Sequence, residues 1–412
     1  MLLHRVFFWL IAFLLLTSYF ITPVNALDVS RPNNKFGIHL ATPSKEELES
    51  AAKLVNTHGG SWGYVTVVIQ DNDRNKVKWQ EAFDHMRDLR LIPVVRLATS
   101  PVGSYWAKPT EKEIENWVRF LNSLRWVTKD RYVVLFNEPN HSQEWGGELN
   151  PEEYAKISYE YAKALKSSNS EYFIMLAGLD LAAASNGVDL DAYNYISRMY
   201  TEKKELKDVV DGLSSHSYPN PGFSGSPYDS GRTSIKGYEW ELDVLRELGV
   251  TKDLPVFITE TGWIHNGADS DAITGNFRTA FEIWQLDDRV RAVTPFILSY
   301  QGEPFTKFSW QKLNSDEFYS HYFEVEAMPK ISGNPAQIQK GRIISELPKD
   351  LLAQSTYHFQ VKLRNEGQAV WTFKDGYKLR VTGYKQEDIE YFFANIDGIK
   401  PGEERDVDLY IK

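Results

Sequence analysis

Between residues 35 and 323, short apolar runs alternate with longer amphipathic segments, and this alternation limits the folds open to the chain. Most of the runs are continuously hydrophobic, as parallel strands buried on both faces are. The segments between them space their apolar residues as helices with one buried face do. The eight runs span residues 36–40, 63–69, 91–97, 132–136, 173–176, 209–214, 256–259 and 292–298. The pattern predicts an α/β fold with a parallel sheet.

Residues typical of helix ends mark the segments between the runs. Ser44 and Thr110 each stand three residues before a glutamate, which is the pattern of a capping box. Asn150 directly precedes Pro151, an order that suits the N-cap and first turn of a helix. Gly249 follows a helical pattern and is expected to end it. These positions predict where four of the helices begin or end.

Eight strand–helix units of this length fit a (β/α)8 TIM barrel, which we predict for residues 27–327. An open, doubly wound sheet is the alternative. Such a sheet usually carries a Gly-rich phosphate turn after its first strand, and residues 40–43 read Leu-Ala-Thr-Pro instead. The barrel is therefore favoured.

The pattern changes after a linker at residues 328–338, which is rich in Pro, Gly and Ser. From residue 339 to 412, apolar and polar residues alternate, as in Tyr357, Phe359 and Val361, and turn residues separate the runs. The spacing from Asn365 to Trp371 resembles Ig-like accessory domains. We predict a small β-sandwich with about five strands where such folds usually have seven, so that one edge is missing. Trp371 is expected in its core rather than on a glycan, and whether the domain binds glycan or braces the barrel stays open.

The first 26 residues have the features of a signal peptide. His4 and Arg5 precede an apolar stretch at residues 6–20, and Val-Asn-Ala at 24–26 suits a cleavage site. An uncleaved anchor is the alternative, because the apolar stretch is close to the length that spans a bilayer. Either reading predicts a secreted or cell-surface protein.

Composition narrows the classes of partner and chemistry. The chain has no cysteine, which excludes thiol catalysis, cysteine zinc sites and disulfides, and in an exported protein favours a bacterial source. A net charge of -10 argues against nucleic acid and favours a neutral ligand. No membrane contact is predicted beyond the N-terminal segment, and the oligomeric state is left open.

Two glutamates directly follow apolar runs. Glu138 lies within Leu-Phe-Asn-Glu-Pro-Asn at 135–140, and Glu260 within Phe-Ile-Thr-Glu-Thr-Gly-Trp at 257–263. A carboxylate at such a position is costly unless it is paired or functional. In a parallel barrel the ends of the strands are also where catalytic groups gather. Glycoside hydrolysis needs two carboxyl groups in different protonation states, so the pair indicates that chemistry.

These two motifs resemble those of clan A, a large group of retaining (β/α)8 glycosidases, with families 5 and 39 nearest in motif. The resemblance covers the barrel but not the C-terminal domain. It implies hydrolysis of a β-glycosidic bond in an oligo- or polysaccharide, without a cofactor. By the resemblance, Glu260 is the nucleophile and Glu138 the acid/base, and Asn137 binds the 2-hydroxyl of the sugar.

Four further residues are expected to line the same site. His216 and Tyr218 look like the clan's His-x-Tyr, in which the tyrosine hydroxyl holds the nucleophile. Arg96 is placed on the third strand, where a cation keeps Glu260 ionised. His39 on the first strand is expected on the floor of the pocket. For Arg96 the alternative is a buried partner for another acid, and for the histidines a packing role.

The aromatic platform for the sugar is less well defined. Clan members often place a Trp on strand eight, but residues 299–301 read Ser-Tyr-Gln. Tyr300 or Trp310 is expected to replace it. Trp side chains stack on sugar rings, so Trp residues on the loops are further candidates. These are Trp106, Trp145 and Trp263.

Three other functions compete with hydrolysis. A metal-dependent barrel hydrolase usually shows His-x-His on its first strand, whereas His39 stands alone, so no metal is expected. A catalytically silent carbohydrate-binding protein is expected to lack one of the two glutamates, and both are present. A transglycosylase uses the same residues and is not distinguished by the sequence. The sugar, the linkage and endo or exo action are likewise not encoded in any recognisable motif.

Overall fold

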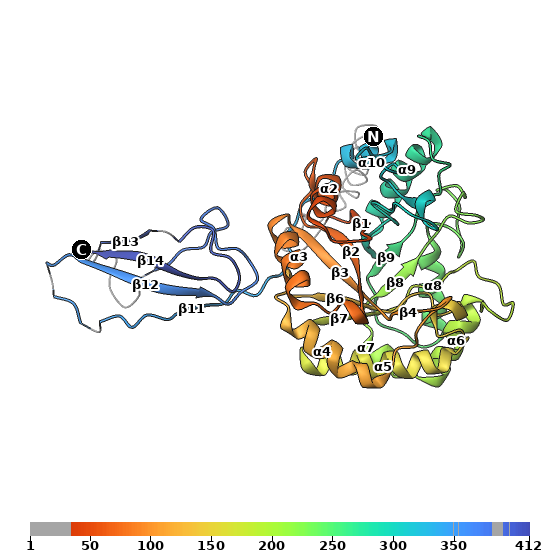
Figure 1. Ribbon diagram of the computed structural model, residues 1–412, viewed down its shortest axis with the longest axis horizontal. Coiled ribbons are helices and arrows are strands. Elements are labelled where there is room, and N and C mark those ends of the chain that lie inside the picture. Colours follow the sequence, from red (N-terminus) through yellow and green to blue (C-terminus); the bar gives the residue numbers. More distant parts are fainter. Residues whose placement is uncertain (1–33, 349, 353, 381–389, 395) are drawn as a thin grey trace, which may run out of the picture.

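The computed structural model describes residues 34–348, 350–352, 354–380, 390–394 and 396–412 (Figure 1). The predicted signal peptide therefore lies outside the described residues. Within the described ranges, no helix combines the length and the hydropathy needed to cross a membrane.

Eight parallel strands form the centre of the larger unit, which confirms the predicted α/β class with a parallel sheet. Five pair in the order β1-β2-β3-β6-β7 and three in the order β10-β9-β8. Isolated parallel bridges from Phe36 to Val293 and from Met175 to Gly212 join the two sheets along both edges. The strands are β1 Gly37–His39, β2 Gly63–Gln70, β3 Leu91–Ala98, β6 Arg131–Leu135, β7 Tyr172–Leu176, β8 Leu213–His216, β9 Val256–Glu260 and β10 Val290–Val293.

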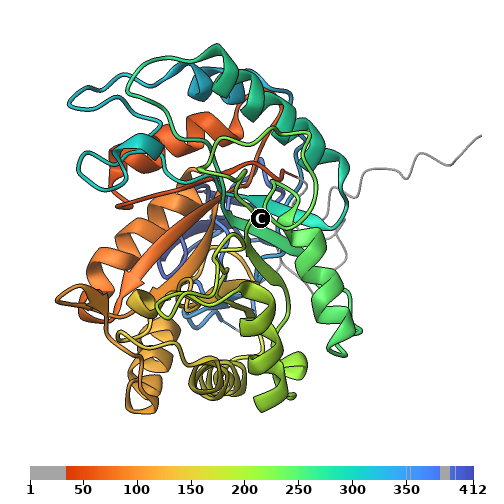
Figure 2. The ribbon, with the colours of Figure 1, turned by 90° about the vertical axis from the view of Figure 1, so that its right-hand side faces the viewer.

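Helices surround these strands, as Figure 2 shows. They are α2 Lys45–Asn56, α3 Lys76–Asp88, α4 Ile114–Ser123, α5 Pro151–Ser168, α6 Ala192–Glu202, α7 Leu206–Val209, α8 Gly237–Glu247, α9 Asp271–Leu286 and α10 Ser320–Ala327. Short elements lie on the loops: 3-10 turns η1 Asp71–Asp73, η2 Glu111–Glu113, η3 Ser142–Glu144 and η4 Thr306–Phe308, and a small hairpin of β4 Pro101–Val102 and β5 Tyr105–Trp106.

Three of the four predicted helix boundaries are confirmed. The Ser44 hydroxyl accepts a hydrogen bond from the Glu47 amide at 3.2 Å. Asn150 caps α5 in the same way, and Gly249 follows α8 with a φ of 89°. The fourth is wrong: Thr110 makes no capping hydrogen bond with its side chain, because a 3-10 turn follows it and α4 begins only at Ile114.

The run at 209–214 also differs from its prediction as a continuous strand. Its first residue ends α7, and β8 begins at Leu213. Leu206 and Val210 are both buried at a spacing of four, so the first apolar residues of the run belong to a helical turn.

Large aromatic rings fill the interior of the strand assembly near the strands' N-terminal ends. Tyr64, Tyr132, Phe173 and Phe257 contact one another with ring centroids 5.0–6.1 Å apart. Each of these residues stands at the first or second position of its strand. The open space is therefore left at the C-terminal ends of the strands.

A smaller unit follows, built on one antiparallel sheet. Its order is β11-β12-β14-β13, with bounds Gly341–Ile343, Tyr357–Asn365, Glu404–Ile411 and Tyr391–Ala394. One face carries a buried apolar cluster that includes Val361 and Val407, and Trp371 packs against it, as its predicted core role requires. Leu379 continues the alternating pattern but lies outside the strands, and Val381 lies outside the described residues.

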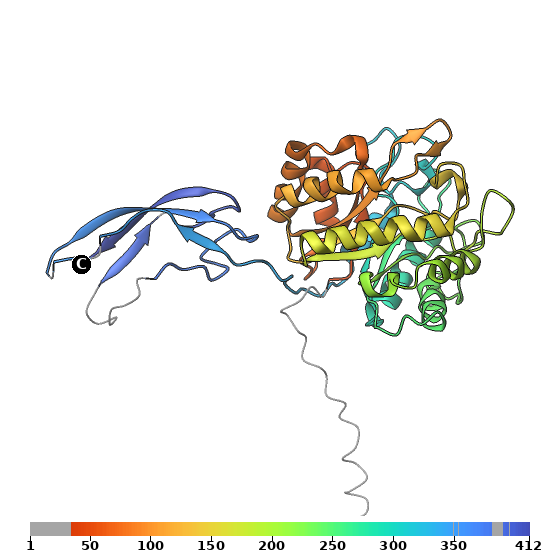
Figure 3. The ribbon, with the colours of Figure 1, turned by 90° about the horizontal axis from the view of Figure 1, so that it is seen from below.

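The smaller unit contacts the loop that precedes β6. The Gln337 side chain donates to the Val127 carbonyl at 2.8 Å, and Gln368 donates to the Thr128 carbonyl at 2.7 Å. Figure 3 shows the two units side by side with an extended connection between them. Since the contact lies at the N-terminal end of β6, it leaves the opposite, C-terminal ends of the strands uncovered.

Candidate active site

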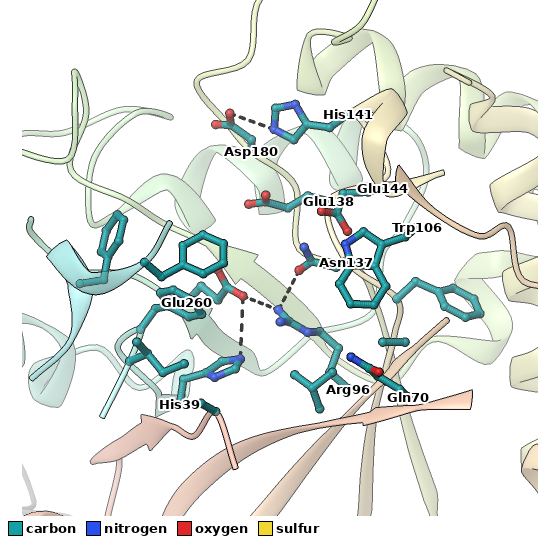
Figure 4. Close-up of a pocket in the computed structure, with 18 of the residues that line it drawn as sticks. His39, Gln70, Arg96, Trp106, Asn137, Glu138, His141, Glu144, Asp180 and Glu260 are labelled. Atoms are coloured by element: carbon teal, nitrogen blue, oxygen red, sulfur yellow. Dashed lines mark hydrogen bonds and ion pairs between the residues drawn. The ribbon is translucent and has the colours of Figure 1, made fainter. Parts of the chain in front are cut away.

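A cavity of about 430 Å³ opens at the C-terminal ends of the parallel strands. Its lining brings together His39 from β1, Arg96 from β3, Glu138 from the loop after β6 and Glu260 from β9 (Figure 4). The cavity is where the predicted catalytic glutamates meet.

Glu260 is the last residue of β9 and is 7% exposed. Arg96 Nη1 donates a short hydrogen bond to Glu260 Oε1, and the Tyr218 hydroxyl donates to Oε2 at 3.1 Å. Burial acts to raise the pKa of Glu260, but the positive charges of His216 and Arg96 outweigh burial and hold the pKa well below its usual range. Glu260 is therefore ionised and oriented by two donors.

Glu138 lies on a strained stretch of backbone just after β6. Its φ is 28° and that of Phe136 is 73°, in the left-handed region that costs non-glycine residues about 1–3 kcal/mol each. Two hydrogen bonds hold the turn: the Glu138 amide donates to the Gly178 carbonyl at 3.1 Å, and the His141 amide donates to the Glu138 carbonyl at 2.9 Å. Strain of this kind gathers at functional sites because the surrounding structure must be built to maintain it.

His216 connects the two glutamates. Its Nδ1 is 2.7 Å from Glu138 Oε1 and 3.9 Å from Glu260 Oε2. Burial would lower the pKa of His216, but the charge of Glu260 and the hydrogen bond to Glu138 raise it. One oxygen of each glutamate and one ring nitrogen of His216 lie within 4.8 Å of one another. The two carboxyl groups thus face each other across a short gap.

Gly178 makes room for this histidine. A Cβ at residue 178 would lie 2.2 Å from His216 Cδ2 and 2.7 Å from its Nε2. The His216 ring therefore packs directly on the backbone that follows β7, and any larger residue at position 178 would displace the ring.

Asn137 and His39 complete the predicted polar set. Arg96 Nη1 also donates to Asn137 Oδ1 at 2.7 Å, and the Asn137 side chain is hydrogen-bonded to Glu144 as well. His39 is 2% exposed, and neither of its ring nitrogens has a hydrogen-bond partner. Burial lowers the pKa of His39 to about 3, so the ring is neutral. An unpartnered buried imidazole at the edge of a cavity can hydrogen-bond a ligand there.

Of the predicted aromatic residues, Trp106 and Tyr300 line the cavity. The other three predicted residues, Trp145, Trp263 and Trp310, are buried instead. Trp145 borders the cavity wall but is 0% exposed, and its Nε1 donates to Glu153 at 2.9 Å. These rings carry no accessible face on which a sugar could stack.

Trp263 and Trp310 do not border the cavity at all. Trp263 packs edge-on against Phe277, and its Nε1 donates to the Gly225 carbonyl at 2.8 Å. Trp310 packs edge-on against both Phe277 and His321. Both rings fill the layer between α9 and the loops above β9 and β10, so they stabilise the loops rather than contact a ligand.

Several lining residues were not foreseen from the sequence. Glu144 on η3 is a third carboxyl group; burial and the nearby charge of Glu138 raise its pKa to about 7. Its position six residues after Glu138 on the same loop was the available signal. An apolar wall was also missed, because phenylalanine on a loop reads as ordinary packing: Phe223, Phe296, Phe305 and Phe308.

The geometry of Glu138, His216 and Glu260 would also suit a metal ion, and no other His, Asp and Glu group among the described residues has that spacing. Arg96 already occupies Glu260 Oε1, however, and its positive charge opposes a second cation at the same oxygen. The electrostatics therefore favour a metal-free carboxylate pair.

Three comparisons with known proteins bear on this site. A monomeric β-xylosidase from Caulobacter crescentus is 11% identical, covers 93% of this chain and 98% of its own, and superposes with a TM-score of 0.51. An endo-β-1,3-glucanase from Pseudomonas viridiflava is 12% identical over 73% of this chain and 98% of its own, with a TM-score of 0.48. At these identities, only the fold of the β-xylosidase is informative.

A search of curated proteins finds no match. The profile of the glycosyl hydrolase catalytic core, in contrast, matches residues 59–340, about two thirds of the sequence and the whole region that carries Glu138 and Glu260. The chain is a glycoside hydrolase and belongs to the glycosyl hydrolase catalytic core family.

Proposed function

We propose that this glycoside hydrolase cleaves a β-glycosidic bond in a neutral oligo- or polysaccharide with retention at the anomeric carbon. The observation that carries the proposal is the pair of glutamates whose carboxyl oxygens lie within 4.8 Å across one cavity. Retaining enzymes hold their two carboxyl groups roughly 5–5.5 Å apart, whereas inverting enzymes leave room for a water molecule between them.

We also infer that the eight strands close into a (β/α)8 barrel of the clan A type, exported by its N-terminal segment. The two parallel bridges that join the sheets support closure. So does the position of the cavity at the C-terminal ends of the strands, where enzymes of this fold place their sites.

The difference between the two carboxyl groups assigns their roles. Glu260 is ionised by Arg96 and held by Tyr218, so it is the nucleophile. The Glu138 side chain is 21% exposed against 10% for Glu260, and its hydrogen bond to His216 supplies an adjacent proton. Glu138 is therefore the acid/base.

In the first step a Glu260 oxygen attacks the anomeric carbon while the bond to the leaving oxygen breaks. Glu138 gives its proton to that oxygen, and the sugar remains as an ester of Glu260. In the second step water attacks the same carbon, passes a proton to Glu138 and releases Glu260 as a carboxylate. If a sugar hydroxyl attacks in place of water, the same bond changes and the same proton transfer to Glu138 give transglycosylation.

The test is a set of 4-nitrophenyl and 2,4-dinitrophenyl β-glycosides of glucose, xylose and mannose, together with β-1,3-glucan, β-1,4-glucan and xylan. We expect Glu260→Gln to lose at least 10³-fold in kcat on every substrate that the wild type cleaves. Glu138→Gln should lose far less in kcat/KM on the dinitrophenyl glycoside, because that leaving group departs without a proton.

Glu148→Gln, an exposed glutamate on the same loop as Glu138, is the matched control and should retain wild-type rates. Wild-type activity that survives in Glu260→Gln would contradict the proposal. Binding of a glycan without cleavage by the wild type would instead identify a silent carbohydrate-binding protein.

A further inference from the structure

His141 and Asp180 form an ion pair on the wall of the cavity that the reaction described above does not use. His141 Nε2 lies 3.2 Å from Asp180 Oδ2, and its Nδ1 lies 2.7 Å from Asp189 Oδ1. The hydrogen bonds that His141 donates to Asp180 and Asp189 outweigh burial and raise the pKa of His141 to about 9. The histidine is therefore charged, and both of its N–H groups point at carboxylates.

The pair is rigidly placed relative to Glu138. Asn140 Nδ2 donates to the Asp180 carbonyl at 2.9 Å, and the Asp180 amide donates back to Asn140 Oδ1 at 3.2 Å. The His141 amide donates to the Glu138 carbonyl at 2.9 Å. The loops after β6 and β7 are thus tied together beside Glu138, and the pair moves with the acid/base.

Asp180 keeps unused hydrogen-bonding capacity on the cavity side. Its Oδ1 accepts from the Ala182 amide at 2.8 Å and its Oδ2 from His141, whereas an ionised carboxylate can accept about four hydrogen bonds. The side chain is 32% exposed and lines the cavity, but Asp189, behind His141, does not. A fixed carboxylate with free lone pairs is suited to two neighbouring hydroxyl groups of a sugar.

The direction of attack in the reaction identifies which sugar of the substrate lies beside Asp180. Glu260 attacks the anomeric carbon from one side, so the leaving oxygen lies on the other side, where Glu138 protonates it. Figure 4 shows the His141–Asp180 pair beyond Glu138, on the side away from Glu260 and Arg96. Groups in that position contact the part of the substrate that leaves.

We propose that Asp180 binds the hydroxyl groups of a neutral sugar leaving group, and that His141 is the positioning residue that holds Asp180. This inference rests on the proposed function and adds to it a binding site for the departing sugar. An acidic sugar is disfavoured there, because Glu138, Glu144 and Asp180 all line that part of the cavity.

The experiment compares two leaving groups on the same glycone. The first leaving group is a sugar. Its substrate is cellotetraose, laminaritetraose, mannotetraose or xylotetraose, whichever the wild type cleaves fastest. The second leaving group is 4-nitrophenol. Its substrate is the 4-nitrophenyl glycoside of the glycone fragment that cleavage of the tetrasaccharide releases. We expect Asp180→Asn to lower kcat/KM at least tenfold for the oligosaccharide and less than threefold for the nitrophenyl glycoside, since the aryl group offers no hydroxyls. Asn keeps the shape and the acceptor for the Ala182 amide, so folding should be preserved, which circular dichroism checks.

A second readout uses the same site in reverse. A sugar acceptor that intercepts the glycosyl ester occupies the place of the leaving group, so Asp180→Asn should also reduce transfer to added methyl β-glucoside relative to hydrolysis. His141→Gln should show both effects more weakly. Asp253→Asn, an exposed aspartate before β9, is the control and should match the wild type.

Equal losses on both substrates would overturn the inference, since they would place Asp180 in the chemical step or in folding. Unchanged rates on the oligosaccharide and unchanged transfer would overturn it as well. A wild type that cleaves neither substrate would instead contradict the proposed function, so the two failures are distinguishable.

Discussion

The carboxylate of Glu260 is buried, and burial by itself favours the protonated form. The positive charges of His216 and of Arg96, which is in hydrogen-bond contact with Glu260 Oε1, oppose this effect and keep the pKa of Glu260 low. The nucleophile is therefore available across a wide pH range only as long as these cations are present.

Replacement of Arg96 by Met should raise the pKa of Glu260. Activity depends on ionised Glu260, so it disappears as the pH falls through that pKa, and a higher pKa moves the loss to higher pH. We expect the acidic limb of the kcat/KM profile to shift upward by about one unit or more. The solvent-exposed Arg119→Met serves as control; an acidic limb unchanged in Arg96→Met would show that Arg96 does not set the ionisation.

Gly178 affects catalysis only through its contact with His216. Gly178→Ala places a methyl group against His216 and should displace its ring from Glu138. We expect kcat to fall at least tenfold with little change in KM, because the substrate does not touch residue 178. In the control, Gly275→Ala, the new methyl group meets nothing within 4 Å. Wild-type kcat in Gly178→Ala would argue against a positioning role for His216.

Residue types explain which parts of the site could be read from the sequence. Glu138 and Glu260 follow apolar strands, so their places were predictable, as were those of Arg96 and Tyr218. The three buried tryptophans were not, because a ring on a loop can face either the cavity or the layer beneath it. Glu144 and Asp180 lie farther along their loops, where strand periodicity no longer fixes a direction.

At the level of elements, α8 and β8 are joined by a buried acid. Glu241 on α8 is 2% exposed and accepts a short hydrogen bond from Ser215 of β8, whose neighbour His216 contacts Glu138. Burial raises the pKa of Glu241 to about 8. The helix thus holds the strand behind the active site through a carboxyl group that is uncharged at neutral pH.

This arrangement makes stability depend on pH. The folded protein binds the proton of Glu241 more tightly than the unfolded chain, so the stabilisation is complete below the unfolded pKa and is lost as the pH rises toward 8. We expect the free energy of unfolding to fall by on the order of 2–4 kcal/mol between pH 5 and 9, and Glu241→Gln to remove most of that fall. Urea titrations at several pH values measure it, with the exposed Glu247→Gln on the same helix as control. Equal slopes in wild type and Glu241→Gln would contradict this account.

Helix boundaries were predictable where the capping residue itself makes the hydrogen bond, as Ser44 and Asn150 do. The boundary at Thr110 was not, because a 3-10 turn satisfies the same backbone groups without the side chain. Likewise, apolar spacing alone did not separate α7 from β8, since a four-residue helix and a buried strand share such short patterns.

Over the whole molecule, the active site and the smaller C-terminal unit lie at opposite ends of the strands. The contact between the units includes Gln368, which is 6% exposed and bridges the Thr128 carbonyl and the Ile338 amide. None of the residues that line the cavity comes from the smaller unit. The described part of the smaller unit therefore takes no part in the lining of the cavity.

Gln368→Ala should weaken this contact without affecting catalysis. A buried carbonyl and a partly buried amide lose their partner, at a cost of about 1–3 kcal/mol. We expect faster proteolysis at residues 328–338 and faster hydrogen exchange of the Ile338 amide, with unchanged kcat/KM. Gln360→Ala, on the exposed side of β12, is the control. A loss of kcat/KM in Gln368→Ala would instead show that the smaller unit supports the active site.

The order of α and β elements was predictable at this scale, because eight apolar runs leave few arrangements. The smaller unit was predictable only as a set of alternating strands, since the period-two pattern does not say which strands pair. β11 in particular is three residues long and exposed, so no hydrophobic alternation marks it.

The central claim is that Glu260 forms a glycosyl ester, which water then hydrolyses. Water attacks the anomeric carbon from the side that the leaving group occupied. Proton NMR of a cleavage reaction tests this directly, by following the anomeric signals of the released sugar before it equilibrates. The account predicts that the β anomer appears first and the α anomer only later, through mutarotation. If the α anomer is formed first, cleavage inverts the anomeric carbon, and the double displacement by Glu260 and Glu138 is contradicted.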